Sequence, residues 1–207
     1  MLKGILPSGL EVPSSYEQVG HIVHLNLDES LLPFKYVIGQ VYLDKVPSCK
    51  TVVNKVGQIV SPWRTFDMEV IAGEDNTTVE VKEGNCTFSF DYRKVYWNSR
   101  LHQEHRLLVN SFLNTDCIAD MFCGIGPFVL PAAKKGCRVY GNDLNPRCFY
   151  YLNENLKLNK LENQVIEPKI ETFDLCRQLC ECIISFERRM EELNLELHLE
   201  SYDCAYV

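Results

Sequence analysis

Two short segments each place a carboxylate beside turn-forming residues, a combination that can hold a nucleoside. One reads Asp-Met-Phe-Cys-Gly-Ile-Gly-Pro-Phe over residues 120 to 128, and the other reads Asn-Asp-Leu-Asn-Pro over residues 142 to 146. Apolar residues precede both segments, so each is predicted to follow a strand of an α/β sheet. At the end of the second strand, the carboxylate of Asp143 can accept hydrogen bonds from both hydroxyls of a ribose.

The glycine loop favours a nucleoside without phosphate over a dinucleotide. After Gly124 and Gly126 the chain has Val129, where the pyrophosphate fingerprint takes a small residue. Asp120 would repel a phosphate but attract an ammonium group. We therefore expect S-adenosyl-L-methionine as the cofactor, with an NAD-like ligand or a purely structural loop as the alternatives. The expected contacts from the two segments are Asp120, Phe122, Gly124, Gly126, Asp143 and Leu144.

Helices and strands alternate around these segments, as in an α/β sheet. Helical spacing is predicted before the first strand, over residues 101 to 113, and after the glycine loop, over residues 129 to 135. Asn145 and Pro146 supply an N-cap and a first residue for a further helix. A third strand is predicted over residues 164 to 170.

The pattern then continues with a helical stripe over residues 175 to 193 and the beginning of a fourth strand near residue 202. Three and a half strands make an unusually small α/β sheet, so we expect a domain that is incomplete at its C-terminus.

The first hundred residues have a different pattern. One helix is predicted from Pro33 onward, and residues 83 to 85 predict the turn of a hairpin. We therefore expect a small α+β domain over residues 1 to 99 and the N-terminal part of a Rossmann-like domain over residues 100 to 207. The predicted strands are residues 22 to 27, 51 to 60, 68 to 72, 78 to 81 and 87 to 92.

Composition argues against a membrane or metal protein. No apolar run approaches the roughly 20 residues that cross a bilayer. The ten cysteines are scattered through an apolar chain, which favours reduced thiols. Cys176, Cys180 and Cys182 fall on one predicted helix without a histidine nearby, so we expect no metal.

The net charge of −7 is uneven, because residues 181 to 203 hold seven acids and two arginines. The remainder can therefore present basic patches. One group of four basic residues could contact RNA or could form an ordinary solvent-exposed face, and the sequence supports both interpretations equally. That set is Lys134, Lys135, Arg138 and Arg147.

Several separate motifs between about residues 12 and 160 resemble the eukaryotic and archaeal tRNA (guanine-37-N1) methyltransferase family. The resemblance implies a class I S-adenosylmethionine-dependent methyltransferase (Rossmann-like) domain behind a small α+β domain. A sister family of aminocarboxypropyl transferases in the wybutosine pathway typically has Glu-Trp-Asn-Pro at the second cofactor motif, so Asp-Leu-Asn-Pro favours methyl transfer. The motifs are Val-Gly-His-Ile-Val-His-Leu-Asn from residue 19, Thr-Val-Val-Asn-Lys from residue 51, Arg-Thr-Phe from residue 64, Val-Tyr-Trp-Asn-Ser-Arg-Leu from residue 95, Glu-His from residue 104, and both cofactor segments.

The resemblance also implies roles for individual residues. Arg100 would lie against the target guanine and stabilise charge on its O6 atom, and Glu104 or Asp143 would be the general base. His105 would help to form the cofactor pocket. The implied partner is tRNA, bound by a monomer that is cytoplasmic, with nuclear or mitochondrial pools.

The third cofactor contact of the family aligns with Glu171 and Thr172, with Asp174 as the alternative. The sequence ends at Val207 without the Asn-x-Pro motif of the family. We therefore weigh a fragment of a methyltransferase against a non-catalytic chain that binds S-adenosyl-L-methionine or RNA.

Overall fold

The computed structural model describes residues 4, 6, 7, 9 to 11, 13, 15 to 57, 65 to 162, 165 and 166. No helix within these ranges is long and apolar enough to cross a membrane. The expected helical stripe, the fourth strand and the cysteine group near residue 180 lie outside the described residues. So do Glu171, Thr172 and Asp174.

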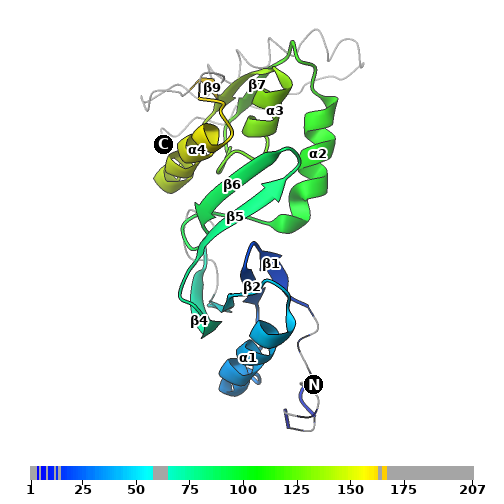
Figure 1. Ribbon diagram of the computed structural model, residues 1–207, viewed down its shortest axis with the longest axis vertical. Coiled ribbons are helices and arrows are strands. Elements are labelled where there is room, and N and C mark those ends of the chain that lie inside the picture. The colour runs from blue at the N-terminus through cyan, green and yellow to red at the C-terminus, as the bar shows by residue number, and fades with distance from the viewer. Residues whose placement is uncertain are drawn as a thin grey trace, which may run out of the picture. The chain divides into compact units, whose positions relative to one another are not determined.

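A four-stranded sheet in the order β1-β2-β3-β4 forms the first part of the chain (Figure 1). The pairing of β2 with β3 is parallel, and the other two pairings are antiparallel. Helix α1 (Lys35–Lys45), preceded by the 3-10 turn η2 (Leu32–Phe34), packs on this sheet and buries Ile38. The strands are β1 (Glu17–Val19), β2 (Ile22–Leu25), β3 (Thr51–Val56) and β4 (Asp67–Gly73).

The predicted hairpin is confirmed as β5 (Thr78–Glu83) and β6 (Cys86–Asp91). The hairpin backbone donates to two later asparagines: Ser89 N to Oδ1 of Asn155 in helix α4 (Pro146–Leu158) over 2.7 Å, and Thr87 N to Oδ1 of Asn159, the residue directly after that helix, over 2.9 Å. The hairpin thus shares its core with the sheet that follows it, and the division that we placed at residue 99 stays a prediction.

The third sheet has the predicted α/β alternation. Its strands are parallel and lie in the order β7-β8-β9. Asn145 caps helix α4 by accepting from Arg147 N over 2.9 Å, and Pro146 follows it, as expected from the sequence. The elements are the 3-10 turn η3 (Ser99–Leu101), α2 (His102–Ser111), β7 (Cys117–Asp120), α3 (Val129–Lys135), β8 (Arg138–Gly141), α4 (Pro146–Leu158) and β9 (Val165–Ile166).

Two of the basic residues considered for RNA contact join neighbouring elements. Nζ of Lys135 donates to the carbonyls of Val109 and Asn110 over 3.0 and 2.9 Å, which satisfies carbonyls at the end of α2. Nζ of Lys134 donates to the carbonyl of Asn85 in the hairpin turn. These bonds favour a structural role for both lysines.

Candidate cofactor site

The glycine loop between β7 and α3 is shaped by two residues with positive φ. Gly126 has a φ of +97°, and a Cβ atom there would overlap Leu130 Cδ1 and lie 2.8 Å from Leu152 Cδ1. Gly124 has a φ of +54°, but its Cβ would meet no described atom within 4 Å. A side chain at Gly126 would therefore overlap buried leucines. The loop is open at Gly124, where a ligand can approach the backbone.

The structure brings the two predicted segments together. Asn142 N donates to the carbonyl of Asp120 and Cys123 N donates to the carbonyl of Asn142, both over 2.8 Å. Asp143 fastens the glycine loop, since its Oδ2 accepts from Gly124 N over 2.8 Å and its Oδ1 from Asn145 N over 2.8 Å. A carboxylate has about four acceptor sites, so Asp143 keeps the capacity to accept from a ribose beyond these two bonds and the one from the Cys148 thiol.

Asp120 carries a buried oxygen that lacks a partner. Its Oδ1 accepts from Phe122 N over 3.2 Å, whereas its Oδ2 has no hydrogen-bond partner among the described residues. Burial raises the pKa of this carboxyl, and the nearby Asp143 raises it further. An unpaired buried oxygen is costly, and a cationic ligand group could satisfy it. This fits the ammonium group of S-adenosyl-L-methionine.

Two large apolar side chains project beside these carboxylates. Phe122 is 85% exposed and Leu144 is 68% exposed. They follow the carboxyl ends of β7 and β8, the edge at which open α/β sheets bind ligands. An apolar part of a ligand, such as an adenine ring, could cover them.

Cysteine chemistry is not supported at this loop. Cys123 and Cys148 are both buried. Burial raises the pKa of the Cys148 thiol to about 12, and that of Cys123 is also raised, so both thiols stay protonated at neutral pH.

His105 is buried beside the glycine loop. Its ring lies edge-on to Phe128, with centroids 4.8 Å apart and an interplanar angle of 78°. Its Nδ1 donates to Oε1 of Glu83 over 2.6 Å. Our sequence interpretation missed Glu83, although it continues the inward-facing alternation of Val79 and Val81 in β5.

The structure does not bring Arg100 and Glu104 into contact with the glycine loop. Both are exposed, Arg100 on η3 and Glu104 in the first turn of α2. Arg100 N donates to Oδ1 of Asn98 over 3.0 Å. Neither side chain has a hydrogen bond or ion pair within the described ranges, so their catalytic roles stay predictions.

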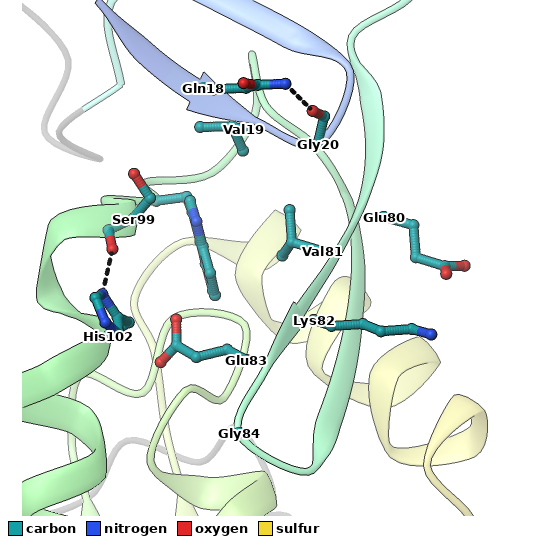
Figure 2. A pocket seen from close by; sticks show the side chains of 11 residues that line it. Gln18, Val19, Gly20, Glu80, Val81, Lys82, Glu83, Gly84, Ser99 and His102 are labelled. Carbon is teal, nitrogen blue, oxygen red and sulfur yellow. Dashed lines mark hydrogen bonds between the residues drawn. The ribbon is translucent and has the colours of Figure 1, made fainter. Parts of the chain in front are cut away.

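A pocket of about 420 Å³ lies between β5 and the beginning of α2. Figure 2 shows Glu83 on one wall and Ser99 and His102 on another. Ser99 and His102 flank Arg100 in the sequence. The pocket therefore extends from the turn that carries the predicted catalytic arginine to the partner of His105.

Comparisons with known proteins show which families and structures this chain resembles. A family model described as the TRM5/TYW2 methyltransferase domain matches residues 78–193, and one described as the TYW2 N-terminal domain matches residues 1–77. The tRNA (guanine(37)-N(1))-methyltransferase of Dictyostelium discoideum is 50% identical over 187 residues, which are 90% of this chain and 41% of that protein. This chain therefore spans less than half of that relative's length.

Two solved structures are also similar. The aTrm5 of a complex with tRNALeu has a TM-score of 0.69 and 31% identity, over 74% of this chain and 46% of that chain. P. horikoshii TYW2 in complex with MeSAdo has a TM-score of 0.68 and 27% identity, over 84% of this chain and 62% of that chain. Both support the class I methyltransferase fold that we predicted.

Proposed function

Because this chain belongs to the TRM5/TYW2 methyltransferase family, we propose that it binds S-adenosyl-L-methionine at the glycine loop. The observation that carries the proposal is the buried Oδ2 of Asp120, which has no hydrogen-bond partner in the described part of the chain. Asp120 would hold the ammonium group, Asp143 the ribose hydroxyls, and Phe122 and Leu144 the apolar parts. When bound, the cofactor supplies a methyl group on a sulfonium.

We propose that the reaction is methyl transfer to N1 of guanosine 37 in tRNA. A relative with 50% identity carries that name, and a similar structure is a complex with tRNALeu. Guanine N1 is protonated, so the reaction needs a base and a group that stabilises charge on O6. Arg100, whose side chain has no described partner, would stabilise the charge on O6. Glu104 or Asp143 would accept the proton from N1.

Single-turnover methylation with a labelled methyl donor tests this proposal. We expect methyl transfer to a tRNA with guanosine at position 37 and none to the same tRNA with adenosine there. The assay should use a protein of the same length as the relatives, and the 207-residue chain should be assayed in parallel. Equal labelling of both tRNAs would contradict the assignment of the target base.

One further reaction has specific support. The family model at residues 1–77 describes a TYW2 domain, and a similar structure is a TYW2 protein. The alternative proposal is therefore transfer of the aminocarboxypropyl group of the same cofactor. Mass spectrometry of the modified nucleoside separates the two groups, and Leu144 in place of tryptophan favours methyl transfer.

The family resemblance supports three further proposals. Glu171 and Thr172 contribute to the cofactor site, with Asp174 as the alternative. The chain acts as a monomer. It works in the cytoplasm, with nuclear or mitochondrial pools. The non-catalytic alternative, binding without turnover, predicts cofactor affinity but no labelled product.

A further inference from the structure

A largely buried pair of ionisable side chains lies beside the glycine loop, outside the chemistry proposed above. His105 on α2 and Glu83 at the end of β5 are joined over 2.6 Å, and their side chains are 10% and 13% exposed. A hydrogen bond to a charged acceptor away from water is short and strong. The pair therefore holds the hairpin and α2 together at a defined point.

The orientation of His105 also affects the loop. Since Nδ1 donates to Glu83, the opposite edge of the ring remains for other partners. The ring packs edge-on against Phe128, the residue immediately before α3. His105 also lowers the pKa of the Asp120 carboxyl, although burial outweighs this effect. Glu83 is thus linked to the end of the glycine loop through one intermediate side chain, His105, whose ring contacts Phe128.

We propose that Glu83 is a positioning residue for the cofactor: it orients His105, which in turn sets the surroundings of the Asp120 carboxylate that receives the cofactor's ammonium group. This inference rests on the proposed function of the site. Glu83 itself touches neither the cofactor nor the reacting atoms. At metal sites, partners that orient a ligating side chain typically change affinity by about 10–100-fold, and we expect the lower end here.

The same strand supplies a matched control. Glu80 is exposed, and its side chain has no described hydrogen bond or ion pair. Figure 2 shows Glu80 and Lys82 directed away from His102, whereas the Glu83 carboxylate lies on the same side of β5 as His102. Glu80→Gln and Glu83→Gln remove the same charge from one strand, but only the second removes the charged partner of His105.

Two probes separate positioning from general stability. S-adenosyl-L-methionine carries the ammonium group, whereas 5′-methylthioadenosine keeps the nucleoside and lacks the amino acid. By calorimetric titration, Glu83→Gln should bind S-adenosyl-L-methionine about 10-fold more weakly and 5′-methylthioadenosine with nearly unchanged affinity. Glu80→Gln should bind both probes like the wild type. Glu83→Asp keeps the charge and should recover part of the lost affinity.

The contrary results are distinct. Equal weakening of both probes by Glu83→Gln would show a merely structural role and overturn the proposal, as would unchanged affinity for S-adenosyl-L-methionine. If Glu83→Gln does not fold, the two affinities of Glu83→Asp decide by the same criterion. A wild-type chain that binds neither probe contradicts the proposed function itself, and the positioning role with it.

Discussion

Replacing Asp120 by asparagine should make the ligand-free protein more stable and the cofactor complex weaker. Asparagine keeps the oxygen that accepts from Phe122 N, and it removes the charge of an oxygen that is buried without a described partner. Asparagine leaves a neutral amide group at that place, and an unsatisfied buried group costs more when it is charged than when it is neutral, so the change should relieve on the order of 1 kcal/mol. For a chain of this size, we expect Asp120→Asn to raise the unfolding midpoint by about 2–4 °C at neutral pH.

The stability gained by Asp120→Asn over the wild type should increase with pH. Burial raises the pKa of Asp120 in the folded state above the roughly 3.9 of an unfolded aspartate. The folded chain therefore binds the proton more tightly, and wild-type stability falls as pH rises from the unfolded pKa through the folded pKa. The advantage of Asp120→Asn should be full above that window and shrink as pH falls through it.

Cofactor binding should change in the opposite sense. A charge-assisted hydrogen bond is worth roughly 1.5–3 kcal/mol, so its loss should weaken S-adenosyl-L-methionine binding by about 10–150-fold. Thermal unfolding followed by circular dichroism, with and without the cofactor, measures both effects. Glu80→Gln controls for the loss of one charge at an exposed position. A less stable Asp120→Asn protein with unchanged cofactor affinity would refute the reasoning.

Three other predictions concern the loop, the hairpin and catalysis. Gly126→Ala should cost about 2–5 kcal/mol in urea unfolding, because it combines a positive φ with overpacking, whereas Gly124→Ala, with open space around it, should cost only about 1–2 kcal/mol; equal costs would contradict the packing argument. Asn155→Ala should cost about 1–3 kcal/mol in the same assay, because Ser89 N loses its acceptor; an unchanged midpoint would count against this. Arg100→Ala should slow single-turnover methyl transfer by about 10²–10³-fold with cofactor affinity intact, and a normal rate would make Arg100 an ordinary surface residue.

Local signals in the sequence determined much of the fold. The cap at Asn145, the first helical residue Pro146 and the hairpin turn near Gly84 depend on a few neighbouring residues, so they could be recognised without the rest of the chain. The two cofactor segments could also be placed after strands, because the apolar residues that precede them are local signals. Strand β1, with three residues, is too short for a periodic signal, and it was missed.

Contacts between distant residues were decided only by the tertiary structure. Glu83 and His105 are 22 positions apart, and no local pattern indicates that they form a buried pair. Asp143 was predicted as a ribose ligand, but its bond to Gly124 N, 19 positions earlier, arises only when parallel β7 and β8 place the ends of both strands side by side. The sequence could therefore identify the chemical groups at the sheet edge. Strand pairing and burial determined which of them are hydrogen-bonded, and they leave Oδ2 of Asp120 buried without a partner among the residues that the structure describes.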